Sequence, residues 1–267
     1  MKAFRTIEIS DADGAGLRYV TVKSAALGAR ADMTVFAPRE AIARHDVPLV
    51  ILLHGVYGSH WAWAHQGRAH ETLQRLVTVG DVPPMALAMP SDGLWGDGSG
   101  YLRHPTQDFE SWIVNEVPIA TAMALPCVSA SSKHFVSGLS MGGFGALRLG
   151  AKYPHRFAGA SGHSSITEFE QLKLFIEEDL ASYGAPAEDR SVLETILRNR
   201  DRLPPLRFDC GASDLLIEQN RALHRMLNEE RVRHVYEEFP GAHEWPYWRK
   251  HVEETFRFFG KLCSAQS

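Results

Sequence analysis

Short apolar runs alternate with segments of helical periodicity along most of the chain. Residues 48–53 and 84–89 are almost entirely apolar, which is typical of central strands that are covered on both faces. Residues 61–79 and 109–125 place apolar side chains at the spacing of one helix face and therefore predict helices. This alternation predicts an α/β fold with a mostly parallel, doubly covered sheet.

The two ends of the chain extend this pattern. Residues 4–37 indicate β structure, with antiparallel strands expected over 4–9, 19–22 and 33–36. Further strands are predicted over 156–161, 206–210 and 233–239, and further helices over 218–228 and 245–262. Residues 167–201 are expected to form a mostly helical insertion. We therefore expect one α/β domain over residues 1–267.

The sequence Gly-Leu-Ser-Met-Gly at 138–142 joins a predicted strand to a predicted helix. A strand, a sharp turn carrying G-x-S-x-G and a helix form the context of a nucleophile elbow. A glycine-rich turn with a surface serine is the simpler interpretation, but Gly143 and Gly145 allow close helix packing and favour Ser140 as a nucleophile. The Met141 N–H, at the helix N-terminus, is then expected to stabilise developing negative charge.

A serine nucleophile needs a histidine within hydrogen-bond reach and a carboxylate that orients it. In hydrolases with this elbow the chain order is Ser, acid, His, so the histidine is expected between the last strand and the final helix. His243 occupies that position. Three other late histidines fall within predicted helices or a strand, where a packed or solvated side chain is the usual finding: His224, His234 and His251.

The acid is expected in the turn after the preceding strand. Asp214 lies in this turn, at the end of the sequence Gly-Ala-Ser-Asp. An aspartate after a strand is often an ordinary turn residue, and Asp209 is a rival, although it lies within the predicted strand. Asp214 is the expected acid, and Asp209 stays open as the alternative.

The loop at 54–58 follows the first long central strand and contains glycine, which lets the backbone approach a substrate. The Val56 N–H is the expected second oxyanion donor, and His54 is interpreted as a residue that stabilises the loop. Tyr57 and Trp95 are expected to contact the substrate, although aromatic side chains in such folds pack in the core about as often. The same ambiguity applies to Trp61, Trp63 and Tyr101.

Composition narrows the classes of function. A length of 267 residues, 45% of them hydrophobic, suits one large domain, and a net charge of −4 provides no basic face for nucleic acid or an anionic membrane. No apolar run reaches the ~20 residues that span a bilayer, and the first residues lack the apolar core of an export signal. Three widely spaced cysteines do not form a disulfide framework and indicate a reducing cytoplasm. The histidines at 54, 60, 65 and 70 lack the spacing of a zinc site, so no metal is expected.

Five linked motifs resemble the esterase D family of α/β-hydrolases, which includes tributyrin and feruloyl esterases, S-formylglutathione hydrolases and mycolyltransferases. The motifs lie at 53–58, 89–91, 138–143, 210–214 and 240–245. The resemblance implies an α/β-hydrolase fold, a Ser–His–Asp triad without a cofactor, and an oxyanion hole at Met141 and Val56. It also favours a partial cap over 163–201, because insertions after this strand commonly overhang the serine in that family. Where S-formylglutathione hydrolases carry Ser-Gly-Leu-Thr-Cys, this chain has His-Gly-Val-Tyr.

We therefore expect a serine carboxylesterase that hydrolyses small or short-acyl esters through an acyl-enzyme intermediate. An acyltransferase or a thioesterase would use the same triad. A non-catalytic binding module is a third alternative, against which the intact order of Ser, Asp and His argues. The expected partner is a small-molecule ester, with no nucleic acid and no membrane, and a homo-oligomer is left open.

Overall fold

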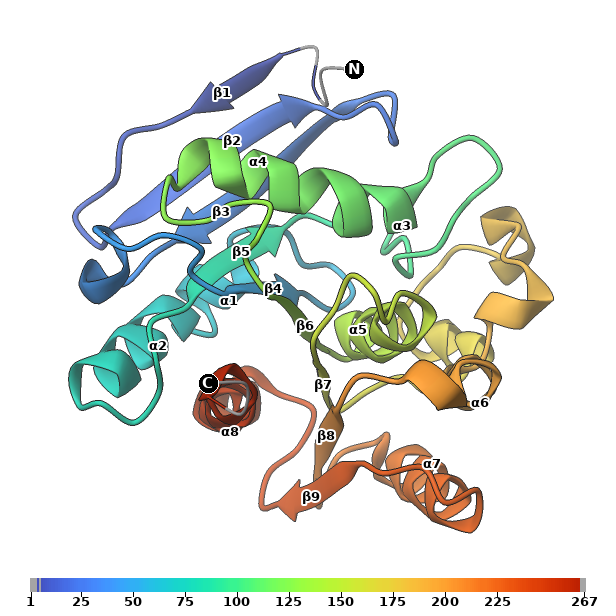
Figure 1. Cartoon of the computed structure of the whole chain (residues 1–267). Helices are drawn as coiled ribbons and strands as arrows, with labels where there is room; N and C mark the ends of the chain where they lie inside the picture. Colours follow the sequence, from blue (N-terminus) through green and yellow to red (C-terminus); the bar gives the residue numbers. More distant parts are fainter. Residues whose placement is uncertain (1–3, 5, 265–267) are drawn as a thin grey trace.

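The computed structural model describes residue 4 and residues 6–264, which contain one nine-stranded sheet (Figure 1). The strands are β1 (Ile7–Ile9), β2 (Leu17–Lys23), β3 (Arg30–Phe36), β4 (Leu49–Leu53), β5 (Ala86–Pro90), β6 (His134–Leu139), β7 (Ala160–His163), β8 (Leu206–Gly211) and β9 (Val235–Phe239). Their order across the sheet is β1-β2-β3-β5-β4-β6-β7-β8-β9. The pairs from β1 to β5 are antiparallel, and every pair from β5-β4 to β8-β9 is parallel. The predicted sheet, mostly parallel with antiparallel strands at its start, is confirmed.

Helices cover both faces of this sheet. They are α1 (Ala62–His65), α2 (Ala69–Thr78), α3 (Phe109–Ser111), α4 (Val117–Ala124), α5 (Met141–Lys152), α6 (Val192–Arg198), α7 (Ile217–Glu229) and α8 (Trp245–Ser264). In Figure 1, α2 and α8 lie side by side on one face, and α4 and α5 lie on the other. Among the described residues, no helix combines the length and the apolar character needed to cross a lipid bilayer.

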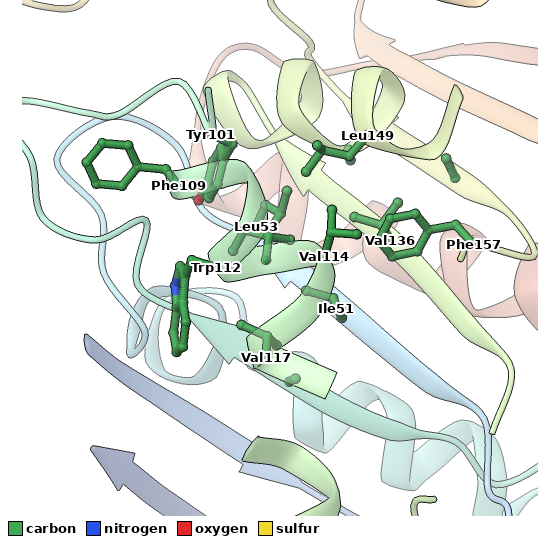
Figure 2. Close-up of a cluster of buried hydrophobic side chains, with 14 of the residues drawn as sticks. Ile51, Leu53, Tyr101, Phe109, Trp112, Val114, Val117, Val136, Leu149 and Phe157 are labelled. Atoms are coloured by element: carbon green, nitrogen blue, oxygen red, sulfur yellow. The ribbon is translucent and has the colours of Figure 1, made fainter. Parts of the chain in front are cut away.

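Strand β4 shows that the centre of the sheet is buried from solvent on both faces. All five of its side chains are buried. Ile51 and Leu53 join the apolar cluster beneath α4 and α5 (Figure 2), whereas Val50 and Leu52 join the cluster beneath α2 and α8. Successive strand side chains point to opposite faces, so a strand that is covered on both must be apolar throughout. Each such buried side chain contributes about 1.5–3 kcal/mol, and β4 is therefore a firm support for the loop that follows it.

The helix predicted over 61–79 is wrong as a single element, because the chain breaks between α1 and α2. Arg68 takes a left-handed backbone conformation with a φ of 48°. A Cβ at Gly67 would lie 2.7 Å from the Trp63 ring. Trp63 is buried, and its indole N–H donates to the Leu53 carbonyl at 2.9 Å. The chain thus turns closely around an anchored tryptophan, which helical periodicity alone does not reveal.

The strand predicted over 156–161 begins later, as β7. The register with β6 pairs Val136 with Ala160 as the first residues of the ladder. Phe157 precedes this pair but is buried in the core beneath α5. Its apolar character reflects packing in the connection and not strand pairing, so the predicted strand started too early.

Residues 109–125 form the continuous helical stretch that was predicted, with an irregular middle. The turn Trp112–Glu116 is π-helical, and Pro118 follows it at the start of α4. Proline has no N–H to donate to the carbonyl four residues earlier, and its ring crowds that carbonyl. The wider π turn accommodates the proline without ending the helix.

Residues 167–201 contain less helix than predicted. Short 3-10 turns lie at Phe169–Leu174, Leu180–Tyr183, Ala187–Asp189 and Arg200–Arg202, and α6 is the one α-helix of this segment. Gly184 has a φ of 57° and Pro186 follows two residues later, so a continuous helix cannot form there. In Figure 1 the segment runs in yellow and orange beside α5.

Candidate active site

Ser140 lies at the sharp turn between β6 and α5. Its φ of 56° and ψ of −118° are strained for a residue with a side chain. A Cβ at Gly138 would lie 2.3 Å from the Gly142 carbonyl oxygen, and a Cβ at Gly142 would lie 2.3 Å from the Leu53 carbonyl oxygen. Both flanking glycines are therefore sterically required. The Ser140 N–H donates to the His163 carbonyl at 2.9 Å, which ties the turn to the end of β7.

His243 lies between Ser140 and Asp214. Its Nε2 is 3.0 Å from the Ser140 hydroxyl oxygen, and its Nδ1 is 3.0 Å from each carboxylate oxygen of Asp214. The three residues follow β6, β8 and β9, at the carboxyl ends of the strands, where open α/β sheets bind their ligands. The hydroxyl, imidazole and carboxylate thus stand in the order that activates a serine.

The Asp214 carboxylate is held in its charged form. Burial opposes ionisation, but hydrogen bonds from His243 and from the Leu216 amide, together with the charge of His243, keep the pKa of Asp214 below its ordinary value. The Leu216 N–H lies 2.8 Å from one carboxylate oxygen. An ionised carboxylate at this position can orient the imidazole and stabilise an imidazolium.

Asp209, the alternative acid, belongs to a different set of contacts. It is fully buried in β8, 2.6 Å from the Arg207 guanidinium, 2.8 Å from His163 Nδ1 and 2.6 Å from the Tyr247 hydroxyl. Burial opposes its ionisation, but His163 and Arg207 hold the pKa of Asp209 far below its usual range. The structure therefore brings Asp214, and not Asp209, against His243.

The two residues whose amides are predicted to bind an oxyanion, Val56 and Met141, lie beside Ser140 and close to each other. Met141 opens α5 directly after Ser140, and Val56 lines the cavity above that serine. The two side chains meet at Gly98, where a Cβ would lie 2.5 Å from the Met141 sulfur and 3.6 Å from a Val56 methyl. Within the described part of the chain, neither amide N–H donates to a protein acceptor. Both therefore remain free to donate to a bound oxygen atom.

His54 supports the loop that carries Val56. Its Nδ1 lies 2.7 Å from the Gly55 carbonyl, and its Nε2 accepts a hydrogen bond from the Asp92 N–H at 3.0 Å. The buried Tyr101 hydroxyl donates to the His54 carbonyl at 3.0 Å. These contacts agree with the interpretation of His54 as a loop-stabilising residue, and they place Tyr101 in the core.

A cavity of about 520 Å³ opens over Ser140. Tyr57 and Trp61 both line it and are 67% and 40% exposed, so they form part of its rim. Trp95 is not among the described residues that line the cavity, and it packs edge-on against Tyr183 with ring centroids 4.7 Å apart. Of the two predicted substrate contacts, the structure therefore places Tyr57, but not Trp95, at this cavity.

Two aromatic residues that were not predicted as site residues enclose the His243 ring. Phe175 stacks on it, with ring centroids 5.2 Å apart and planes inclined by 25°, and Trp248 meets it edge-on at 5.0 Å. Leu174 and Phe175 carry the segment 163–201 to the cavity wall, as a partial cap would. Trp248 follows the motif that ends at residue 245, whereas no sequence pattern distinguishes Phe175.

The early histidines have structural partners of their own. His60 Nδ1 lies 2.8 Å from the Thr34 hydroxyl, and His70 packs edge-on against Phe36. Among the described residues, no three His, Cys, Asp or Glu side chains gather into a group that could hold a metal ion.

Comparison with known proteins identifies the family to which this chain belongs. A family model described as "Putative esterase" matches residues 24–259. The acetyl esterase of Caldicellulosiruptor saccharolyticus is 29% identical over 236 residues, which cover 81% of this chain and 85% of that protein.

Solved structures of the same fold include two proteins of Staphylococcus aureus. FphF, a fluorophosphonate-binding serine hydrolase, aligns with a TM-score of 0.77 at 19% identity and covers 91% of this chain and 97% of its own. The S-formylglutathione hydrolase FrmB aligns with a TM-score of 0.75 at 16% identity and covers 95% and 98%. Because the family model spans most of the sequence, the chain belongs to this esterase family and is a serine ester hydrolase with the α/β-hydrolase fold.

Proposed function

We propose that this chain hydrolyses small, short-acyl carboxylic esters with Ser140, His243 and Asp214 as its catalytic triad. The observation that carries the proposal is the position of His243, whose two ring nitrogens lie 3.0 Å from the serine hydroxyl and from the carboxylate. This position suits a general base that one neighbour orients and that acts on the other. Membership of the esterase family identifies the reacting group as an ester.

The reaction proceeds in two halves. Ser140 Oγ attacks the ester carbonyl carbon while His243 Nε2 takes the hydroxyl proton, and the amides of Val56 and Met141 donate to the resulting oxyanion. The imidazolium gives its proton to the leaving alcohol as the ester C–O bond breaks, and an acyl-enzyme remains. Water then attacks the acyl carbon and loses a proton to His243, which returns it to Ser140 as the acid departs.

The walls of the cavity favour a short acyl group. Trp61, Trp245, Trp248 and Phe175 all line a space of about 520 Å³, which lies toward the lower end of small-molecule sites. Large rigid rings occupy volume that a long acyl chain would need. The similarity to a protein named acetyl esterase supports the same preference.

A thioesterase of the S-formylglutathione hydrolase type is the main alternative, because such an enzyme has this fold. Carboxylates beside the rim favour the neutral ester instead. The Tyr57 N–H donates to the Asp97 carbonyl at 3.0 Å, the Glu177 N–H to the Asp97 carboxylate at 2.6 Å, and the Asp97 N–H to the Glu178 carboxylate at 3.0 Å. These three acidic side chains would repel the carboxylates that glutathione itself carries.

The cysteines support a reducing compartment for this activity. Cys127, Cys210 and Cys263 are all free thiols, and the first two are buried. Disulfides are uncommon where glutathione and thioredoxin keep thiols reduced. We therefore propose that the enzyme acts in the cytoplasm.

The test is hydrolysis of p-nitrophenyl esters from acetate to decanoate by the wild type and by Ser140→Ala. Activity should be greatest on the shortest chains and fall by about 10³-fold or more in the variant, with unfolding temperature unchanged. Added alcohols that divert the acyl group from water would reveal an acyltransferase. A folded wild type that hydrolyses none of the esters and resists fluorophosphonate labelling would overturn the proposal.

A further inference from the structure

The loop at residues 91–100 is a fixed support beside the active site. Asp92 is buried, and its carboxylate accepts hydrogen bonds from the Ser99 N–H at 2.6 Å and from the Leu94 N–H at 2.9 Å. The Asp92 N–H in turn donates to His54 Nε2 at 3.0 Å. These bonds close the loop on itself and attach it to the end of β4, so it can hold other segments that bond to it.

Asp97 lies in this loop and bonds to two segments of the site. Its backbone carbonyl accepts a hydrogen bond from the Tyr57 N–H at 3.0 Å, and its carboxylate accepts one from the Glu177 N–H at 2.6 Å. The Asp97 N–H donates to the Glu178 carboxylate at 3.0 Å. One residue therefore joins the loop that carries Val56 to the segment 163–201.

The first of these segments is strained where Asp97 holds it. Tyr57 follows Val56 and has a φ of 58°, in the left-handed region that side chains rarely adopt. Strain of this kind persists only where the surroundings fix the backbone, and it is found preferentially at functional sites. The bond from the Tyr57 N–H to Asp97 is such a contact. It therefore helps to keep Val56, a predicted oxyanion donor, beside Ser140.

The second segment carries the ring that covers His243. Phe175 stacks on this histidine with ring centroids 5.2 Å apart, and its N–H closes a short turn by donating to the Leu172 carbonyl at 2.8 Å. Glu177 follows two residues later, and its N–H attaches this turn to the Asp97 carboxylate. Hydrogen bonds to a charged acceptor are stronger than neutral ones. Asp97 therefore restrains the position of Phe175 as well.

We propose that Asp97 is a positioning residue of the reaction, which fastens the segment 163–201 to the loop that carries Val56. By this link it keeps Phe175 on His243 and Val56 beside Ser140. The inference rests on the proposed function. Asp97 is not among the described residues that line the cavity, so it acts through its neighbours. Misplaced catalytic groups slow the chemical step more than they weaken substrate binding.

The test compares Asp97→Ala with Asp97→Asn and with a control, Asp179→Asn. Alanine removes the acceptor of the Glu177 N–H, whereas asparagine keeps an oxygen there without the charge. Asp179 is an exposed residue of the same segment, and its carboxylate accepts from the Ala181 N–H, as asparagine also can. On p-nitrophenyl acetate, Asp97→Ala should lower kcat by about tenfold with at most about a twofold change in KM. Asp97→Asn should lower kcat by only about two- to threefold, and Asp179→Asn should match the wild type.

The acyl-chain profile separates positioning from general damage. The Tyr183 hydroxyl also attaches the segment to this loop, because it donates to the Gly98 carbonyl at 2.6 Å, so Asp97→Ala should fold with a nearly unchanged unfolding temperature. A loosened wall should raise the octanoate-to-acetate ratio of kcat/KM by about threefold or more, whereas a loss of folded protein lowers all esters equally. Glu178→Ala removes the acceptor of the Asp97 N–H and should raise the ratio in the same way.

The outcomes are distinct. If Ser140→Ala is inactive while Asp97→Ala keeps the wild-type kcat and acyl profile, the positioning role is wrong. An Asp97→Asn variant as slow as Asp97→Ala would also overturn it, because the charge and not the bond would then matter, as would an equal loss in Asp179→Asn. Failure of the proposed function would appear instead as ester hydrolysis that survives Ser140→Ala, whatever the result at Asp97.

Discussion

Two arrangements of a hydroxyl, an imidazole and a carboxylate lie close together in this molecule. Only one of them borders the cavity over Ser140. In the first, His243 lies 3.0 Å from Ser140 and from Asp214. In the second, His163 lies 2.9 Å from the Thr255 hydroxyl and 2.8 Å from Asp209. Distances alone therefore do not distinguish a catalytic site from a structural network.

What differs is the surroundings. The His243 side chain is 13% exposed and lines the cavity, whereas His163 has no exposed surface. Thr255 lies within α8 and has no strained turn or helix N-terminus beside it. Asp209 is also bound by Arg207, which compensates its charge within the core. The arrangement of Thr255, His163 and Asp209 therefore has the features of an internal ion-pair network, which holds β7, β8 and α8 together.

The largest contrast is expected from replacing each histidine by asparagine. His243→Asn should lower kcat/KM by about 10⁴-fold or more at unchanged unfolding temperature, because the serine loses its base. His163→Asn should keep activity within about tenfold but destabilise the fold by about 3–5 kcal/mol, since it removes a partner of a buried carboxylate. Ester kinetics and urea unfolding of both variants check this. A folded His163→Asn protein without activity would contradict the division of roles.

A smaller effect is expected in the pH dependence of stability that Asp209 causes. The pKa of Asp209 is lowered in the folded protein, so its contribution to stability is fully present above the ordinary value of 3.8 and declines as pH falls below it. Asp209→Asn should therefore be less stable than the wild type at pH 7, and the gap should narrow by about 1.4 kcal/mol per pH unit below ~3.8. Urea midpoints between pH 7 and pH 2.5 measure the gap. A gap that is constant over that range would show that the charge of Asp209 contributes nothing.

The smallest effect concerns the wall of the cavity. Phe175→Leu removes the ring that stacks on His243 but keeps an apolar side chain, so kcat/KM for the acetate ester should fall by about two- to fivefold. Longer acyl chains should lose less or gain, because the ring no longer fills the space. Leu174→Ala is the neighbouring control, since Leu174 also lines the cavity, has no ring to stack on His243 and is 59% exposed. An identical acyl profile for Phe175→Leu and the wild type would remove Phe175 from the determinants of specificity.

Local sequence carried the prediction of the elbow and of the order Ser, Asp, His. Gly138 and Gly142 have a steric requirement that is visible in the motif, and His243 lies in the one interval between the last strand and the final helix. The choice between Asp209 and Asp214 rested on position, because Asp209 was expected within the strand and Asp214 in the turn beyond it. Strand β8 does end at Gly211, before Asp214, but the buried network of Arg207, Asp209 and His163 left no signal in the sequence.

Contacts between distant segments explain what sequence reasoning missed. Phe175 reaches His243 from 68 residues away, and Asp97 reaches Glu177 from 80 residues away. The break at Arg68 follows from the anchoring of Trp63 on β4, and the late start of β7 follows from its register with β6. None of these leaves a periodic signal, because each depends on how the elements pack.

One residue, His163, connects the two arrangements of hydroxyl, imidazole and carboxylate. The ring of His163 is the centre of the buried network, and its backbone carbonyl accepts the hydrogen bond from the Ser140 amide. The internal ion pairs are thus joined through His163 to the turn that carries Ser140. Replacing this network with apolar side chains to raise thermal stability would therefore also alter the support of the turn at Ser140. Such variants should be selected for turnover as well as for melting temperature.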